Sequence, residues 1–127
     1  MPRAFRPPSA RVAGFGSARK GREHWIAHRV SAIAVIPLGV WFAVSLIAHA
    51  GSDYSELVSW VKAPPTTLCL VLLLAAAFHH AALGLQVVIE DYAGSKSKYA
   101  ALIAVRLLCY ALAVGGSLAV LRVAFGR

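Results

Sequence analysis

Residues 66–92 read TTLCLVLLLAAAFHHAALGLQVVIEDY, an apolar run in which the first charged residue is Glu90. A helix needs about 20 apolar residues to cross the hydrocarbon core of a bilayer, so this segment is long enough to span it. Two further apolar blocks, residues 25–50 and 99–125, have similar lengths. Lipid offers the backbone no hydrogen-bond partners, and three spans cannot close a barrel, so each span is expected to be a helix. The predicted fold is all-α and integral to the membrane, with transmembrane helices at residues 25–50, 66–90 and 99–125.

The composition also favours a membrane protein. The chain is 59% hydrophobic and only 14% charged, which leaves too little polar surface to cover a water-soluble domain. Its net charge is +8, but the positive residues gather before the first span, where such charge sets membrane orientation and does not indicate nucleic-acid binding. Residues 1–24 are therefore interpreted as a basic cytoplasmic tail and residues 25–127 as a three-helix membrane domain.

The two connections between the spans indicate how the chain is oriented. In residues 51–65, GSDYSELVSWVKAPP, the pair Asp53 and Glu56 is typical of a capping box and predicts a short amphipathic helix at the membrane surface, ended by Pro64 and Pro65. The positive charges of the N-terminal segment and of residues 91–98 place both on the cytoplasmic side. This orientation suits a bacterial cytoplasmic (inner) membrane, with a mitochondrial inner membrane as the less favoured alternative.

Two adjacent histidines lie deep within the second span. His79 and His80 point about 100° apart on a helix, so they cannot face the same partner. Gly84 and Asp91 continue the stripe that begins at His80, and the glycine leaves room for a flat, bulky group against the helix. A neutral imidazole at this depth is a functional hypothesis, with haem ligation as one possibility. The alternative, which spacing alone favours, is a histidine that hydrogen-bonds a neighbouring helix without any cofactor.

Several polar residues lie near the predicted cytoplasmic ends of the spans. Arg29 either extends to lipid phosphates or clamps an anionic group such as a haem propionate. The carboxylates of Glu90 and Asp91 end the second span, where the helix dipole disfavours them, so we expect a cationic partner. Tyr92 offers a phenolic donor that suits a carbonyl of a lipid-soluble ligand.

The stretch HAALGLQVVIEDY, residues 80–92, resembles the second-span motif of a small hydrophobic membrane anchor subunit of succinate dehydrogenase (succinate:quinone oxidoreductase, complex II). That motif consists of a haem-ligating histidine, a glycine four positions on, and an Asp-Tyr pair eleven and twelve positions on, all present here. Residues 23–42, EHWIAHRVSAIAVIPLGVWF, are similar to the family's first span, and the likeness covers about residues 17–125. The extra imidazole of His79 is a departure.

The resemblance implies a set of roles. His80 supplies one axial ligand of a b-type haem shared with the second membrane anchor of the complex, and the haem lies near Gly84 and Arg29. Tyr92 hydrogen-bonds a carbonyl oxygen of ubiquinone, and Asp91 helps to hold that region. The flavoprotein with its FAD and the iron–sulfur subunit are partner chains, the latter docked on the cytoplasmic face. The chain then belongs to an enzyme but performs no chemistry on succinate itself.

Two alternatives stay open on the sequence. One is a fumarate reductase-type anchor that works in the reverse direction with menaquinone. The other is a cofactor-free structural or assembly membrane protein. A small multidrug-type transporter is disfavoured, because such a transporter needs an acidic residue deep in the membrane and these spans carry none.

Overall fold

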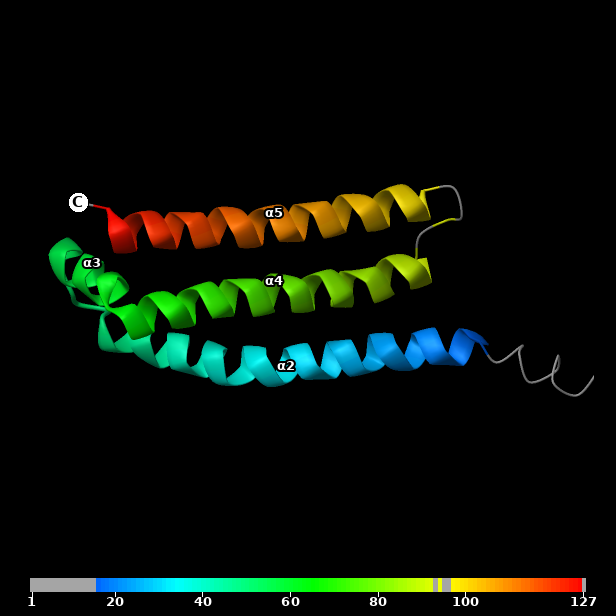
Figure 1. Cartoon of the computed structure of the whole chain (residues 1–127), viewed down its shortest axis with the longest axis horizontal. Helices are drawn as coiled ribbons and strands as arrows, with labels where there is room; N and C mark the ends of the chain where they lie inside the picture. The colour runs from blue at the N-terminus through cyan, green and yellow to red at the C-terminus, as the bar shows by residue number, and fades with distance from the viewer. Residues whose placement is uncertain (1–15, 93, 95–96, 127) are drawn as a thin grey trace, which may run out of the picture.

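The computed structural model describes residues 16–92, 94 and 97–126. Within them the chain forms four helices: α2 (Gly16–Ala48), α3 (Tyr54–Lys62), α4 (Pro64–Tyr92) and α5 (Lys98–Phe125) (Figure 1). The three long helices are each long and apolar enough to cross a membrane, and the short one lies between the first two. The predicted all-α fold with three spans and an intervening short helix is confirmed.

The ends of the helices differ from the predicted span limits. Helix α2 begins at Gly16, well before Trp25, so residues 16–24 of the predicted tail are helical, and residues 1–15 lie outside the described residues. The bilayer-length apolar part of this helix is Gly21–Ala48. Hydropathy marks where lipid ends, whereas a helix continues into water through good helix formers such as those at residues 18–20. Helix α4 includes Pro64 and Pro65, because the first turn of a helix does not need their missing amide hydrogens.

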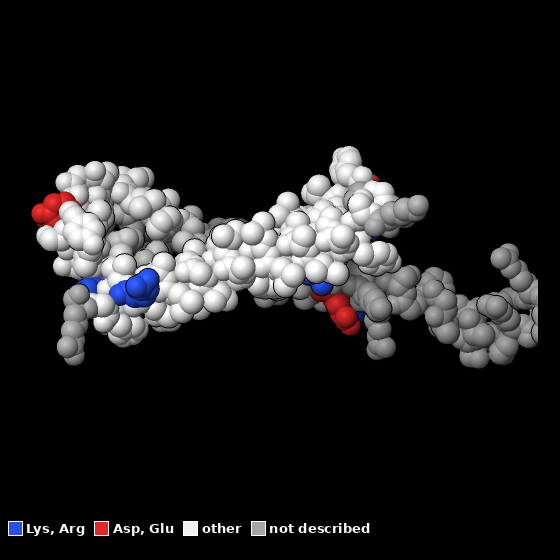
Figure 2. Space-filling view, turned by 90° about the horizontal axis from the view of Figure 1, so that it is seen from above, with Lys and Arg blue, Asp and Glu red and all other residues white. Residues whose placement is uncertain are grey.

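The long helices form a single layer. Helix α4 lies in the middle and packs against α2 on one side and α5 on the other, while α2 and α5 make no contact with each other among the described residues (Figure 1). Few side chains are buried: apart from Ser31, Thr66 and Thr67 they are Leu70, Ala82, Cys109 and Ala113. Many large apolar side chains are exposed, among them Ile33, Ile47 and Leu107, and these are expected to face lipid or a partner chain. Figure 2 shows charged side chains toward the two ends of the molecule and an uncharged stretch between them, as a bilayer requires.

Helix α3 is capped as the sequence predicts. The Asp53 carboxylate accepts hydrogen bonds from the backbone amide of Glu56 at 2.9 Å and from the hydroxyl of Ser55 at 2.8 Å. These bonds stabilise the charged form and lower the pKa of Asp53, with the Glu56 amide as the largest cause. The carboxylate thus satisfies one of the free amides at the start of the helix.

Aromatic packing and a threonine fix α3 across the end of the layer. The Trp60 ring stacks on Trp41 of α2 with centroids 6.2 Å apart, and it also contacts His49 at 5.0 Å. The hydroxyl of Thr67, at the start of α4, donates to the carbonyl of Val61 at 2.6 Å. These contacts hold α3 against the ends of its neighbours.

Candidate functional site

The two adjacent histidines of α4 face different helices. Nδ1 of His80 lies 2.9 Å from Oγ of Ser31 on α2, whereas Nδ1 of His79 lies 3.2 Å from the hydroxyl of Tyr110 on α5. This arrangement confirms the prediction, made from helical geometry, that the two imidazoles do not share a partner. His80 is therefore the histidine that joins α4 to α2.

Ser31 is the buried link in this contact. Only 8% of its surface is exposed, and besides approaching His80 its hydroxyl donates to the backbone carbonyl of His28 at 2.8 Å. A bond of this kind to its own helix is the default role of a serine in a membrane span. The contact with His80 is an addition that the sequence did not indicate.

His28 covers His80 on one side. The two imidazole rings pack with centroids 4.4 Å apart and planes inclined by 38°. His28 also reaches the glycine predicted to leave room beside α4: a Cβ built on Gly84 meets Nε2 of His28 at 3.9 Å, an ordinary van der Waals distance. His28, His80 and Gly84 thus form one contact cluster between α2 and α4.

An open groove runs along this cluster, on the side of the histidines nearer the Tyr92 end of α4. Its volume is about 460 Å³, and its wall is formed by Gly21, His24, Trp25, His28, Gly84 and Val87. Nε2 of His24 is buried there and has no hydrogen-bond partner among the described residues. The wall contains Gly84, as the sequence predicts, but His80 lies behind His28 and is not part of the wall. The groove therefore presents the imidazoles of His24 and His28 first.

Arg29 contacts one residue of the groove wall but does not line the groove itself. Its guanidinium carbon is 4.9 Å from the ring centroid of Trp25, a cation–π distance, and Trp25 forms part of the wall. The side chain of Arg29 is exposed.

Asp91 and Tyr92 end α4 beyond the groove. Asp91 follows groove residue Val87 by one helical turn, and both end residues are exposed, Tyr92 at 86%. Neither side chain makes a hydrogen bond or an ion pair within the part of the chain that the structure describes.

Lys98 is the cation found at the end of α4, and it bonds the backbone carbonyl of Glu90 instead of a side-chain carboxylate. Lys98 donates to the backbone carbonyl of Glu90 at 2.8 Å, near the negative end of the α4 dipole. The Glu90 side chain accepts instead from Gln86 at 2.8 Å, and Gln86 in turn accepts from Arg106 of α5. Among the described residues no ion pair of the Glu90 carboxylate is found, and the expected cationic partner stays a prediction.

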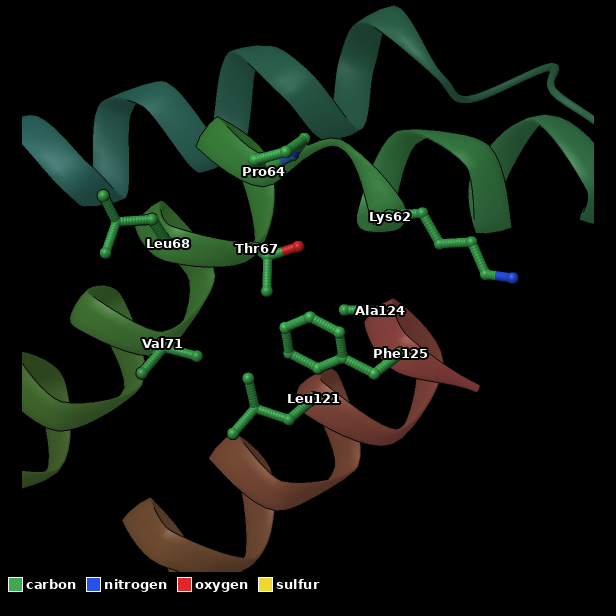
Figure 3. Close-up of a pocket in the computed structure, with 8 residues that line it drawn as sticks. All are labelled: Lys62, Pro64, Thr67, Leu68, Val71, Leu121, Ala124 and Phe125. Carbon is green, nitrogen blue, oxygen red and sulfur yellow. The ribbon is translucent and has the colours of Figure 1, made fainter. Parts of the chain in front are cut away.

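His80 does not line either of two further hollows. A second groove between α2 and α4, of about 480 Å³, is lined mainly by alanines and includes Ser31 and His79. At the far end of the layer, Figure 3 shows a mostly apolar cavity of about 290 Å³ with Lys62 at its edge. The polar groups there are already paired, since Lys62 donates to the carbonyl of Gly126 and Thr67 to Val61. Among the described residues, no group of three or more His, Cys, Asp or Glu side chains could hold a metal ion.

The family of the chain follows from comparison with known proteins. The model of the succinate dehydrogenase/fumarate reductase transmembrane subunit family matches residues 3–113. The chain belongs to this family. It is 33% identical over 104 residues to the succinate dehydrogenase hydrophobic membrane anchor subunit of Rickettsia bellii, covering 81% of this chain and 83% of that one. The subunit of the same name from Rickettsia conorii is 30% identical over 107 residues, 83% of this chain and 85% of the other.

A more distant relative extends the match over most of the chain. The succinate dehydrogenase hydrophobic membrane anchor subunit of Paracoccus denitrificans is 26% identical over 119 residues, 94% of this chain and 92% of that one. No solved structure matches the chain. The resemblance noted from the second-span motif is confirmed. The chain is a multi-pass membrane anchor subunit of the succinate dehydrogenase type, and its relatives are parts of an enzyme complex.

Proposed function

We propose that this anchor subunit binds a b-type haem through His80 and a quinone beside Tyr92, and that it helps to pass electrons from the iron–sulfur subunit to that quinone. The observation that carries the proposal is the His80 imidazole, held by Ser31 at 2.9 Å between two membrane-spanning helices and beside a groove with a glycine in its wall. An imidazole is costly to keep in lipid without a purpose, and it is a common axial ligand of haem iron.

The residues around His80 fit a haem. Its Nδ1 is engaged by Ser31, and Nε2 has no hydrogen bond among the described residues, so one nitrogen remains for iron. Gly84 and the open groove provide space for a flat ring system, with His24 and His28 along the same wall. When bound, haem supplies one-electron transfer chemistry. This chain would offer a single histidine to the iron, and the other protein ligand would come from the second membrane anchor of the complex.

Arg29 is proposed to bind the haem propionates. Carboxylates in a low-dielectric region need cationic partners, and a guanidinium provides a forked pair of donors. Its position over Trp25 places the charge beside a residue of the groove wall. The other role open to Arg29 is binding to lipid phosphates. That role does not require the contact between Arg29 and Trp25.

Tyr92 is proposed to hold ubiquinone by one carbonyl oxygen. As the quinone is reduced, that oxygen becomes more negative, so a phenolic hydrogen bond stabilises the reduced form more than the starting quinone. The side chain is 86% exposed at the end of α4 and has no competing partner among the described residues. Asp91 precedes Tyr92 and lies on the helix stripe of His80 and Gly84. In this proposal it helps to hold the quinone-binding region.

The iron–sulfur subunit is proposed to dock at the end of the layer that carries Tyr92. The iron–sulfur clusters lie in that subunit and FAD lies in the flavoprotein, so this chain performs no chemistry on succinate. The family model covers both succinate dehydrogenase and fumarate reductase, but the relatives described above are succinate dehydrogenase subunits, which favours succinate oxidation. Their bacterial sources favour a bacterial cytoplasmic membrane.

The absorption spectrum of the assembled complex tests the proposal. We expect dithionite-reduced complex to show b-type haem bands that His80→Ala weakens or removes, while His79→Ala leaves them in place. His28→Ala is the second comparison, because His28 and not His80 lines the groove. Unchanged bands in His80→Ala would refute the ligand assignment, and a loss confined to His28→Ala or His79→Ala would transfer it to that residue.

A further inference from the structure

We infer that Ser31 is a positioning residue that fixes the proton of His80 on Nδ1 and so leaves Nε2 as the bare nitrogen that binds iron. The inference rests on the proposed role of His80 as a haem ligand. It adds a residue on α2 that controls a ligand on α4. Ser31 does not touch the iron in this account.

The assignment follows from counting hydrogens. The Ser31 hydroxyl has one hydrogen and lies 2.8 Å from the carbonyl oxygen of His28 and 2.9 Å from Nδ1 of His80. A backbone carbonyl can only accept, so the hydroxyl hydrogen is given to His28. The contact with His80 is then a hydrogen bond only if Nδ1 carries a hydrogen and donates it to the serine oxygen. With the proton on Nε2 instead, two acceptors compete for one hydrogen and one contact is lost.

The surroundings make both hydrogen bonds matter. Ser31 is 8% exposed and lies within a membrane-spanning helix, where water is not at hand to replace a lost partner. A polar contact left unmade in such a place costs more than one at a wetted surface. The tautomer with the proton on Nδ1 is the one that keeps both serine contacts as hydrogen bonds.

The consequence for iron is both electronic and geometric. A hydrogen bond from the far nitrogen of a ligating imidazole holds the ring orientation and raises its basicity. A more basic ligand favours ferric over ferrous iron, which lowers the reduction potential. Because Ser31 and His80 belong to different helices, the packing of α2 on α4 also sets the angle of the ligand ring.

The test compares Ser31→Ala with Ser31→Thr in the assembled complex. Threonine keeps the hydroxyl and alanine removes it. We expect Ser31→Ala to raise the haem midpoint potential, alter the low-spin ferric electron paramagnetic resonance signal and weaken haem retention about tenfold or more. A tenfold change in the ferric-to-ferrous preference corresponds to about 59 mV for a one-electron couple. Ser31→Thr is expected to restore all three readouts, which a simple packing role for the side chain does not predict.

Two outcomes would overturn the inference. One is a wild-type potential and signal in Ser31→Ala, and the other is an equal change in the alanine and threonine variants. Co-purification of the variant subunit with the other chains from solubilised membranes confirms that each complex has assembled. If the alanine variant does not assemble, Ser31→Cys supplies a weaker acceptor of similar shape, and a wild-type potential in that variant overturns the inference as well.

The outcome for His80 separates the two proposals. If His80→Ala keeps the haem bands, the proposed function fails, and the role of Ser31 fails with it. If His80→Ala loses the bands while Ser31→Ala keeps the wild-type potential, haem ligation by His80 stands and only the role of Ser31 is refuted.

Discussion

Nδ1 of His80 and Oγ of Ser31 lie 2.9 Å apart and join the central helix α4 to α2. The same α4 histidine contacts the ring of His28, whose Nε2 lies beside Gly84. A hydrogen-bonded imidazole, an aromatic neighbour and a residue without a side chain therefore meet at one point of the helix layer.

Gly84 provides a test of whether a ligand occupies the groove. A methyl group added here meets His28 Nε2 at 3.9 Å, so the protein itself accommodates Gly84→Ala without strain. We expect normal assembly but reduced haem content, because the methyl group narrows the space proposed for the ring system. Gly115→Ala on α5 is the matched control, since its added carbon has nothing within 4 Å. Full haem content in Gly84→Ala, measured per assembled complex, would argue against a haem lying on this glycine.

Arg29 is expected to influence the haem potential through its charge. A cation near the haem stabilises the form with one more electron, so Arg29→Gln should lower the midpoint potential, and Arg29→Lys should change it less. The shift should shrink as salt is raised, because the side chain is exposed. Redox titration of the two variants at low and high salt gives the comparison. Equal potentials in wild type and Arg29→Gln would leave membrane anchoring as the role of this residue.

Tyr92→Phe separates quinone reduction from succinate oxidation. Losing one phenolic hydrogen bond should lower quinone reductase activity roughly tenfold, while succinate oxidation with a soluble acceptor stays at the wild-type rate. Tyr99→Phe is the control, because Tyr99 is a similarly exposed tyrosine at the same end of the layer, 75% exposed against 86% for Tyr92. Wild-type quinone activity in Tyr92→Phe, or an equal loss in both variants, would remove Tyr92 from the quinone site.

The Asp53 cap should make helix α3 sensitive to acid. Its pKa is lowered by the hydrogen bonds from Glu56 and Ser55, so the charged form stabilises the folded helix. That contribution is complete above the ordinary aspartate pKa of about 3.9 and is lost as the pH falls through the lower folded value. Protection of the α3 amides against hydrogen exchange, taken relative to the intrinsic rate at each pH, should fall over this range in wild type and be reduced about five- to tenfold at neutral pH in Asp53→Ala. Asp53→Asn keeps an acceptor that does not titrate, so an acid transition of wild-type size in that variant would contradict the prediction.

The sequence predicted the helices well because lipid is a demanding solvent. An apolar block of membrane length must be helical, and consecutive residues on a helix must diverge, so the spans and the separation of His79 from His80 could both be derived. The glycine beside the site was also predictable, since Gly84 lies on the His80 stripe.

The parts that the sequence did not predict involve helix packing. Side chains that face lipid and side chains that face another helix are both apolar, so hydropathy does not show which side of α2 meets α4. His28 and Ser31 were therefore not recognised as neighbours of His80, and His24 was not recognised as part of the groove wall. His24 and His28 are four residues apart, and Ser31 follows His28 by three. This helical spacing places the three residues on one side of α2 and is the sequence signal for that side. The single-layer arrangement, with α2 and α5 apart among the described residues, also depends on packing alone.

An experimental density map of the assembled complex in a lipid environment tests the central claim most directly. The account predicts a porphyrin against Gly84, with its iron at coordination distance from Nε2 of His80 and Nδ1 of that ring hydrogen-bonded to Ser31. A map in which the iron binds His28 or His79, or in which His80 contacts only protein and acyl chains with no porphyrin beside it, would contradict the account.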